Sequence, residues 1–586
     1  MKALLTGNEA IARGAYEAGV KVAAGYPGTP STEILENIVQ YSEIYSQWSP
    51  NEKVAFEVVI GASISGVRAL ATMKHVGVNV AADPLFTFAY TGVNGGFVFV
   101  SADDPGMHSS QNEQDNRRYG KFAKIPVIEP SDSQEAKDFV AEAYDLSESF
   151  DTPVMLRITT RIAHSQSMVE LGEVQKAIKK EYVKNAPKYV MVPAHGRQRH
   201  LVVEKRLAEL KKWAEDTKLN RMEIKDKSFG IITGGICYQY AKEAFPEASI
   251  LKLGMCYPLP EEMIRKFASQ VGQLFIVEEL EPFWEEEIRN MGIEVKGKLI
   301  FPKTGELSAA MISESISMDL GLEHVNVEKI ATTNLPTTPP RPPVLCPGCP
   351  HRAVFHVLKK LKLTVSGDIG CYTLGSLPPL EAIDTTICMG ASIGVALGME
   401  KGNPELAGKV VAVIGDSTFF HSGITGLVDM VYNKSHGTVM ILDNSTTAMT
   451  GHQDHPATGQ TLMEEPASII QIGDLVRSLG IKRVVELDPF EMAKLEAVVK
   501  EELSAPEVSV IIAKRPCALL EKPTGLSASI DKDKCINCKQ CLAIGCPAIA
   551  IRNGQVSLNE SICTGCNLCV QICKVKAIRK AGDNNE

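Results

Sequence analysis

A chain of 586 residues is too long for one hydrophobic core, so roughly three to five domains are expected. Acidic and basic residues are mixed, the formal net charge is -9, and no basic stretch carries interleaved aromatic residues, which argues against a nucleic-acid-binding chain. The N-terminus has no signal-peptide core, and the longest apolar stretch, 86–100, is too short and too rich in glycine to span a bilayer.

Residues 1–185 alternate apolar runs with helical patterns, which is typical of an α/β domain. Segments 76–82 and 96–100 are predicted to be buried strands, and 55–74 is predicted to be a helix rich in small residues. At 25–33 the sequence Gly-Tyr-Pro-Gly-Thr-Pro-Ser-Thr-Glu predicts a strand-to-helix turn, which by itself could be an ordinary helix cap.

A second α/β domain is predicted over 186–335. A charged helical connector is expected near 200–218, and apolar runs at 229–235 and 274–279 are the predicted strands. Five prolines between 334 and 343 then favour an extended, semi-rigid spacer.

A third α/β unit is predicted over 336–525, and it contains the central motif of the chain. The β-branched run 409–414 ends in Gly415-Asp416-Ser417, and the apolar run 439–442 ends in Asp443-Asn444-Ser445-Thr446. With a helical stretch between them, these runs predict one βαβ unit whose two strands end at the same edge of a parallel sheet. Ligands bind at that edge in open α/β sheets.

The residue types at these strand ends suit a metal held against phosphate. Asp416 and Asn444 offer hard oxygen ligands, as magnesium prefers. Gly415 would let the backbone approach a phosphate, and the start of the following helix favours an anion. An ordinary βαβ turn with polar ends would show the same residue types.

Eight of the fifteen cysteines lie in the last segment, 526–586, in two similar runs. The first run is Cys535, Cys538, Cys541 and Cys546, and the second is Cys563, Cys566, Cys569 and Cys573. Three cysteines at intervals of three can wrap three corners of a cubane iron–sulfur cluster, and the fourth must come from elsewhere. A disulfide framework or zinc knuckles are the alternatives, but zinc sites pair Cys-x2-Cys with a distant second pair.

These runs resemble a bacterial two-[4Fe-4S] ferredoxin, in which the fourth cysteine of each run binds the other cluster. The resemblance implies one cluster on Cys535, Cys538, Cys541 and Cys573, and another on Cys563, Cys566, Cys569 and Cys546. The first run has one extra residue before its fourth cysteine, and Lys574 replaces the usual proline.

The Gly-Asp…Asn arrangement resembles the diphosphate motif of thiamine-diphosphate enzymes. The resemblance implies that Asp416 and Asn444 bind Mg²⁺ with their side chains and Thr446 with its carbonyl oxygen. Gly415 and Ser417 would complete the cofactor-binding turn, although Ser417 stands where glycine is common.

Together the motifs resemble the 2-oxoacid:ferredoxin oxidoreductases along the whole chain. The Tyr-Pro-Gly-Thr-Pro turn is similar to the signature of their pyrimidine domain, which implies that Thr29 lies beside the substrate carboxylate. Glu57 is then the acid that shares a proton with the aminopyrimidine ring of thiamine; without this context it is a solvated helix acid. The middle unit, with Leu253-Gly254, Tyr257-Pro258-Leu259-Pro260 and Val277-Glu278-Glu279, looks like their transketolase C-terminal-like domain.

The implied fold class is α/β, with several transketolase-like parallel-sheet domains followed by a two-cluster ferredoxin-like domain. The domains are a pyrimidine-binding domain (1–185), a transketolase C-terminal-like domain (186–335), a diphosphate-binding domain with a proximal cluster (336–525) and the ferredoxin-like domain (526–586).

Related oxidoreductases hold the proximal [4Fe-4S] cluster near thiamine with a Cys-x2-Cys pair and two further cysteines. Here Cys346 and Cys349 supply the pair, and Cys371 and Cys517 lie at suitable positions. Four buried structural cysteines are the alternative, since free cysteine is commonly buried.

The resemblance implies oxidative decarboxylation of aryl pyruvates such as indolepyruvate and phenylpyruvate, or of a different 2-oxoacid. Coenzyme A takes the acyl group and an external ferredoxin the electrons. A smaller subunit is expected as partner, within a dimer of heterodimers. Oxygen-sensitive clusters and unpaired thiols fit the cytoplasm.

Two other classes of protein remain as alternatives. A non-oxidative thiamine enzyme would need no cysteine-rich tail, and a pure electron carrier would need neither the Gly-Asp…Asn motif nor Glu57.

Overall fold

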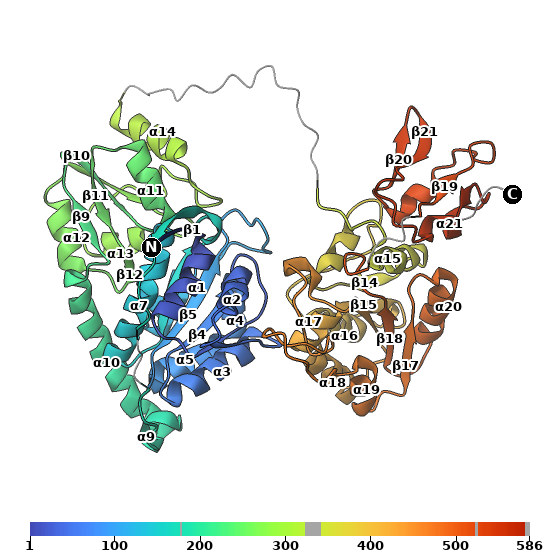
Figure 1. The fold of residues 1–586 in the computed structure, drawn as a ribbon, viewed down its shortest axis with the longest axis horizontal. Coiled ribbons are helices and arrows are strands. Elements are labelled where there is room, and N and C mark those ends of the chain that lie inside the picture. The colour runs from blue at the N-terminus through green and yellow to red at the C-terminus, as the bar shows by residue number, and fades with distance from the viewer. Residues whose placement is uncertain (176–178, 323–341, 522–525, 581–586) are drawn as a thin grey trace. The chain divides into compact units, whose positions relative to one another are not determined.

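The computed structural model describes residues 1–175, 179–322, 342–521 and 526–580. It divides into two compact units, 1–336 and 337–586, and each is described by itself (Figure 1). The predicted proline-rich spacer at 334–343 lies almost entirely outside the described residues. Within the described ranges, no helix is both long and apolar enough to cross a membrane.

The first unit is built on a seven-stranded sheet of order β12-β6-β7-β5-β4-β2-β3, parallel except for β12. Its strands are β2 (Val22–Gly25), β3 (Tyr45–Trp48), β4 (Ala69–Lys74), β5 (Phe97–Asp103), β6 (Val127–Ile128), β7 (Val154–Thr159) and β12 (Met255–Tyr257). β4, β5 and β7 are buried along their whole length, as expected for parallel strands covered by helices on both faces.

Helices cover this sheet, and a short antiparallel pair, β1 (Lys2–Thr6) and β8 (Gln166–Glu170), lies beside it. The helices are α1 (Gly7–Glu17), α2 (Thr32–Ile38), α3 (Glu52–Ile64), α4 (His75–Val80), α5 (Ala82–Thr91), α6 (Arg117–Ala123), α7 (Ser133–Phe150) and α8 (Thr160–His164). A capping box between Thr6 and Glu9 begins α1, and Asn51 caps α3 by accepting a hydrogen bond from the Val54 amide.

The sequence misplaced two elements around β4. The predicted strand at 76–82 is wrong, because α4 and the start of α5 occupy it. The predicted helix 55–74 is right only as far as Ile64, where α3 ends, and its last residues form the buried strand β4. The predicted strand at 96–100 is confirmed as part of β5.

A four-stranded sheet of order β13-β10-β11-β9 completes the first unit. Its strands are β9 (Arg221–Glu223), β10 (Asp226–Thr233), β11 (Ala248–Lys252) and β13 (Gln273–Val277). The helices of this part are α9 (Ala186–Tyr189), α10 (Pro193–Asp216), α11 (Gly235–Ala244), α12 (Glu261–Ala268), α13 (Phe283–Asn290) and α14 (Ala309–Leu320). The predicted charged connector is confirmed as α10.

A buried charge network joins the two sheets. The Arg117 guanidinium donates to Asp115 and, at 2.8 Å, to Glu278 just after β13. Arg157 in β7 donates at 2.6 Å to Glu129. Breaking one partner of a buried ion pair typically costs about 3–5 kcal/mol, so this network fixes the two predicted domains as one unit.

The second unit contains a five-stranded, fully parallel sheet of order β14-β15-β16-β18-β17. Its strands are β14 (Thr364–Ser366), β15 (Val410–Gly415), β16 (Thr438–Asp443), β17 (Arg483–Leu487) and β18 (Ser509–Lys514). Its helices are α15 (His351–Lys360), α16 (Ser392–Gly402), α17 (Asp416–Thr418), α18 (Ile424–Tyr432), α19 (Ile472–Ser478) and α20 (Met492–Leu503). The predicted βαβ unit is confirmed, since β15 and β16 are adjacent and parallel.

The C-terminal module folds as two antiparallel strand pairs with two short helices. The pairs are β19 (Ser529–Ile530) with β22 (Ile578–Arg579), and β20 (Ile549–Arg552) with β21 (Gln555–Leu558). The helices are η6 (Gln540–Ile544) and α21 (Leu568–Ile572). Its buried residues share one hydrophobic cluster with α15 and β15, so the module packs onto the sheet domain.

Candidate active site

At the sheet edge where β15 and β16 end, the Asp416 carboxylate contacts several neighbouring groups. Its Oδ2 accepts hydrogen bonds from the backbone amides of Asn444, at 3.1 Å, and Ser445, at 2.8 Å. His455 Nε2 lies 3.2 Å from the same oxygen. Asp416 Oδ1 accepts from the Ser417 amide at 2.9 Å, and Asp416 is 2% exposed, so its carboxylate is fixed in place.

The three predicted metal ligands converge at this point. The amide group of Asn444 lies 3.1 Å from Asp416 Oδ1 and 3.0 Å from the carbonyl oxygen of Thr446. When the NH₂ of Asn444 points toward these two oxygens, it donates a hydrogen bond to each. When the amide is turned over, its own oxygen faces the other two, and a hard divalent cation bound between the three oxygens would offset their mutual repulsion. The residues present therefore fit a magnesium ion.

Gly415 packs closely against Tyr372, and its expected approach to a phosphate stays a prediction. A Cβ there would lie 2.7 Å from Cε1 of Tyr372, so the glycine makes room for an aromatic ring. The Tyr372 hydroxyl donates at 2.8 Å to the carbonyl of Ile369 and lies 3.3 Å from the Thr418 hydroxyl. The ring thus fixes the turn that carries Asp416.

Two buried groups beside Asp416 have shifted pKa values. Burial raises the pKa of Asp443, and the nearby Asp416 charge adds to the rise. Burial lowers the pKa of His351 to about 4, against the opposite effect of Asp416. His351 is therefore a neutral imidazole at neutral pH.

Four cysteines, Cys346, Cys349, Cys371 and Cys517, lie near one another beside this edge; we call them the Cys346 set. Burial raises the pKa of Cys349 to about 12, and its neighbours Cys346 and Cys371 add to the rise. Burial likewise raises the pKa of Cys371 to about 11, with Cys517 and Cys346 as the next causes. Any metal cluster bound here must displace these protons.

One backbone hydrogen bond joins the Cys346 set to the Asp416 loop. The amide of Cys517 donates at 2.9 Å to the carbonyl of Asn444, and two residues earlier Arg515 donates at 2.9 Å to Asp443. The segment after β18 is thereby held directly against the segment after β16.

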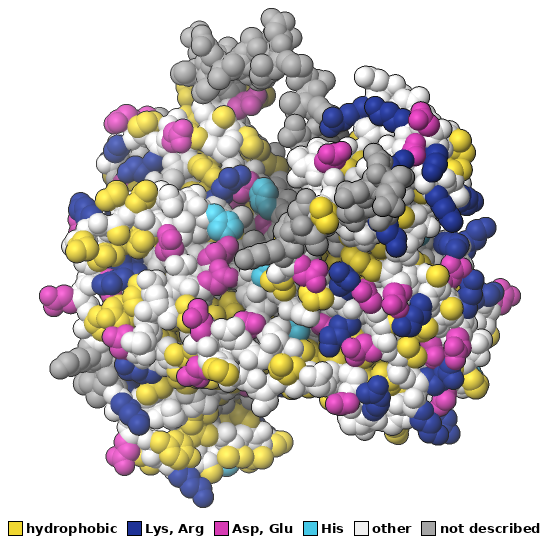
Figure 2. Space-filling model, turned by 45° about the vertical axis from the view of Figure 1, so that its right-hand side comes forward, with side chains coloured by type: hydrophobic (Ala, Val, Ile, Leu, Met, Phe, Trp, Pro, Cys, Tyr) yellow, Lys and Arg dark blue, Asp and Glu magenta, His cyan; other side chains and the backbone are white. Residues whose placement is uncertain are grey.

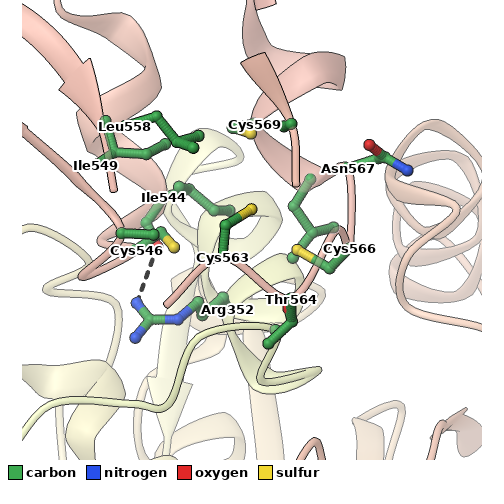
Figure 3. A pocket seen from close by; sticks show the side chains of 14 residues that line it. Arg352, Ile544, Cys546, Ile549, Leu558, Cys563, Thr564, Cys566, Asn567 and Cys569 are labelled. Carbon is green, nitrogen blue, oxygen red and sulfur yellow. Dashed lines mark hydrogen bonds between the residues drawn. The ribbon is translucent and has the colours of Figure 1, made fainter. Parts of the chain in front are cut away.

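The eight tail cysteines line two separate pockets, grouped as the ferredoxin resemblance implies. One pocket, with about 410 Å³ of free space, is lined by the Cys546 set: Cys546, Cys563, Cys566 and Cys569. Figure 3 shows their four sulfur atoms around a common space. The other, with about 350 Å³, is lined by the Cys535 set: Cys535, Cys538, Cys541 and Cys573. In the described part of the chain, no three His, Cys, Asp or Glu side chains could hold a single metal ion.

Thr29 lies at the carboxyl edge of the seven-stranded sheet, in the turn that follows β2. Its carbonyl accepts a hydrogen bond from the Ser109 hydroxyl at 3.1 Å. Lys74, the last residue of β4, donates at 2.5 Å to the Ser109 carbonyl, and its Cβ would lie 3.2 Å from a Cβ on Gly28. The Thr29 turn and Lys74 therefore form one edge of a site.

Lys74 is an unusual cation because it is 9% exposed, and no described acid lies within ion-pair distance of it. Burial lowers its pKa to about 8, while the charges of Asp104 and Glu52 act in the opposite direction. A buried charge without a counter-ion is costly, and such groups are concentrated at functional sites. No motif in the sequence marked this lysine.

Glu57 faces solvent in this single chain, and its expected role stays a prediction. It is on the exposed side of α3, its side chain is 44% exposed, and it pairs with Lys53 one turn earlier. Glu52, in the first turn of the same helix, is 6% exposed and packs against Gly77 of α4. In the sequence Glu52 looked like an ordinary first-turn acid after the Asn51 cap.

Three family models match the chain. Residues 13–207 match "Pyruvate flavodoxin/ferredoxin oxidoreductase, thiamine diP-bdg", residues 368–513 match "Thiamine pyrophosphate enzyme, C-terminal TPP binding domain", and residues 527–574 match "4Fe-4S dicluster domain".

A protein of Archaeoglobus fulgidus, "Indolepyruvate oxidoreductase subunit IorA", is 43% identical over all of this chain and 98% of its own length. The chain belongs to this family. The Methanothermobacter thermautotrophicus protein of the same name is 40% identical over 99% of this chain and 98% of its own length. The IorA-family chain is thus a thiamine diphosphate-dependent 2-oxoacid oxidoreductase with [4Fe-4S] clusters.

Among solved structures, the "2-oxoglutarate:ferredoxin oxidoreductase from Magnetococcus marinus with 2-oxoglutarate, coenzyme A and succinyl-CoA bound" is 14% identical to this IorA-family chain. It covers 54% of this chain and 65% of its own, with a TM-score of 0.47. That likeness is too low to establish a shared fold.

Proposed function

We propose that this chain is the catalytic subunit of an enzyme that oxidatively decarboxylates aryl pyruvates, including indolepyruvate and phenylpyruvate, to aryl-acetyl-CoA. The relatives named indolepyruvate oxidoreductase span the full chain. The observation that carries the proposal is the hydrogen bond from the Cys517 amide to the Asn444 carbonyl, because it joins one member of the Cys346 set to a proposed Mg²⁺ ligand. A decarboxylase without a redox step would need no such neighbour.

Asp416, Asn444 and the Thr446 carbonyl are the proposed Mg²⁺ ligands, and Gly415 and Ser417 form the turn beside the diphosphate. The convergence of three oxygens within about hydrogen-bonding distance supports this set. Thiamine diphosphate, when bound, supplies the electron sink that lets carbon dioxide leave.

Helix α3 supplies the acid that faces the aminopyrimidine ring. Glu57 is the residue that the family resemblance points to, and it would need a second chain to exclude water from its exposed carboxylate. Glu52 is already buried on the same helix, close to Lys74. Burial supports Glu52.

Thr29 and Lys74 bind the substrate carboxylate in this proposal. Lys74 has neutral hydrogen-bond acceptors on Ser109 and no ion-pair partner among the described acids, so an incoming carboxylate would supply the missing counter-charge. A buried charge-assisted hydrogen bond is stronger than a neutral one and would hold the keto acid in one orientation.

Three [4Fe-4S] clusters are proposed, one on each cysteine set. The two tail pockets each present four cysteines around a common space. In the Cys346 set, burial raises the pKa values of Cys349, Cys371 and Cys517, and the neighbouring Cys346 adds to each rise, as closely spaced acids do.

Partners and compartment complete the proposal. The relatives are named as subunits, and we infer a smaller partner subunit in a dimer of heterodimers, coenzyme A as acyl acceptor, ferredoxin as electron acceptor and a cytoplasmic location.

The test is the substrate dependence of ferredoxin reduction by the anaerobically purified enzyme with its partner subunit. Indolepyruvate and phenylpyruvate should be used far faster than 2-oxoglutarate, the substrate named for a relative that is 26% identical over 47% of this chain. Faster turnover of 2-oxoglutarate would overturn the substrate assignment.

Asp416→Ala tests the metal site. Loss of a buried ligand should lower bound thiamine and activity by orders of magnitude while the iron of the tail is retained. Asp429→Ala, an exposed acid on α18, is the matched control and should behave as the unaltered enzyme. Normal thiamine content in Asp416→Ala would show that the metal lies elsewhere.

A further inference from the structure

Arg352 links the Cys346 set to one of the two tail pockets. Its guanidinium is buried and donates at 2.9 Å to the Cys346 carbonyl and at 3.2 Å to the Ile544 carbonyl (Figure 3). It also donates to the carbonyls of Leu345 and Gly545, and Gly545 directly precedes Cys546. One side chain thus contacts the loops that carry two different cysteine sets.

A second contact brings the same loops together. Gly348, between Cys346 and Cys349, has a φ of +73°, and a Cβ there would lie 2.4 Å from the hydroxyl of Thr564. Thr564 follows Cys563 in the other loop. Both Gly348 and Arg352 line the pocket of the Cys546 set, so that set is the neighbour of the Cys346 set.

The Cys535 set has different surroundings. Every residue that lines its pocket belongs to the C-terminal module, between Ile530 and Ile578. Cys538 is exposed, and the adjacent Ile536 is 66% exposed. This set therefore lies on the side of the module that is open to solvent.

The loops around the Cys535 set are basic although the whole chain is acidic. Six exposed lysines form what we call the lysine face: Lys532, Lys534, Lys539, Lys574, Lys576 and Lys580. Figure 2 shows Lys and Arg side chains at the upper right of the molecule, with Asp and Glu side chains among them. Of the two acids in these loops, Asp531 is already paired with Arg579 at 2.6 Å, which leaves Asp533 as the opposing charge.

We propose that the lysine face docks an acidic one-electron carrier protein of the ferredoxin type. The Cys535 set lines the pocket next to this face, so a cluster held there would be the one that gives an electron to the docked carrier and reduces it by one electron. The inference rests on the proposed function, because it requires a cluster on the Cys535 set. It adds the surface by which electrons leave.

Charge and exposure argue for docking by this face. Complementary charge speeds the association of two proteins, and this effect weakens as the salt concentration rises. Association that depends on shape alone lacks this salt dependence. The exposed Ile536 and Val575 line the pocket of the Cys535 set and add apolar surface near the lysines, as protein interfaces commonly have. If the lysines only offset the charge of the cluster, replacing them would change the reduction potential of the cluster and leave partner binding unchanged.

The experiment reverses charge at two lysines that have no side-chain partner among the described residues. Lys532→Glu/Lys574→Glu is compared with Lys409→Glu/Lys482→Glu, which makes the same charge change at exposed sites on the sheet domain. The complete enzyme with its partner subunit is used, with an acidic two-[4Fe-4S] ferredoxin as protein acceptor and benzyl viologen as small acceptor.

In the Lys532→Glu/Lys574→Glu variant, ferredoxin reduction at low salt should fall about tenfold or more and lose most of its salt dependence. Viologen reduction, iron content and the midpoint potentials of the clusters should be undiminished. The control variant should match the unaltered enzyme in every assay.

Three outcomes would overturn the docking face: unchanged ferredoxin reduction across the salt range, an equal loss in the control variant, or shifted cluster potentials that account for the loss. Failure of the unaltered enzyme to reduce viologen with any aryl pyruvate would instead overturn the proposed function.

Discussion

In the proposed site, the buried Lys74 at the end of β4 makes substrate binding sensitive to pH. Because burial lowers the pKa of Lys74 to about 8, the free enzyme loses this positive charge as the pH rises through that value. The bound carboxylate favours the charged form, so KM for aryl pyruvates should be constant below about pH 8 and rise above it. Steady-state KM profiles measure this directly.

Two variants separate charge from packing at Lys74. Lys74→Met should raise KM by about 10²-fold, as loss of a buried charge-assisted hydrogen bond implies, and should flatten the pH profile. Lys74→Arg keeps a charge that does not titrate near pH 8, so it should retain most affinity and also lose the rise above pH 8. A profile in Lys74→Met identical to that of the unaltered enzyme would assign the titration to another group.

Helix α3 offers two candidate acids, and one substitution at each distinguishes them. Replacing the carboxyl group of the acid that contacts the aminopyrimidine ring by an amide should lower the reaction rate by about 10²–10⁴-fold. From its burial, Glu52→Gln should slow exchange of the C2 proton of bound thiamine, measured by quenched-flow NMR, while thiamine still binds. In Glu57→Gln, the C2 proton of bound thiamine should exchange at the normal rate if the Glu57 carboxylate of the unaltered enzyme is solvated. The reverse result would mean that a second chain covers Glu57.

At the scale of elements, the sequence predicted the strands that carry the site better than the boundary between α3 and β4. β15 and β16 are continuous apolar runs rich in β-branched residues, and polar residues stand at or just after their ends, so both their type and their ends could be predicted. β4 reads Ala-Leu-Ala-Thr-Met-Lys, which has good helix formers, and only burial between β2 and β5 makes it a strand.

The same limit explains which site residues were missed. Regular cysteine spacing encodes a loop that wraps a cluster, so all eight tail positions could be grouped from the sequence. Lys74, Glu52 and His455 belong to no spacing rule. They meet their neighbours only through sheet order and loop packing, which a single sequence does not reveal.

The cysteine sets should differ in what their loss does. Cys349→Ala should remove about four irons per chain if the Cys346 set holds a cluster, since a cubane rarely survives the loss of one thiolate. Cys566→Ala should also lose one cluster, but decarboxylation in the absence of a protein acceptor should persist. Iron analysis and carbon dioxide release measure the two effects, and Cys237→Ala, a buried cysteine outside the three sets, is the control. Unchanged iron in Cys349→Ala would leave the set as structural thiols.

At the scale of the whole molecule, we expect the chain to be incomplete by itself. Its described residues fill two units with sheet domains and a ferredoxin-like module, and the proposed acyl acceptor is assigned to none of them. A partner of roughly 200 residues, the size of one ordinary domain, should be needed for coenzyme A-dependent turnover. Co-expression followed by mass measurement and activity assay tests this. Full turnover by the isolated chain would contradict it.

The contact between Gly348 and Thr564 has a consequence for how this chain can evolve. A ferredoxin joined to an enzyme only by a tether could be exchanged for another, because nothing but the tether would have to fit. Here the backbone at Gly348 touches Thr564, and Arg352 is bonded to carbonyls on both sides of the boundary. The C-terminal module is therefore packed specifically against the sheet domain. Substitutions in its two loops and in the Cys346 loop must remain compatible with one another.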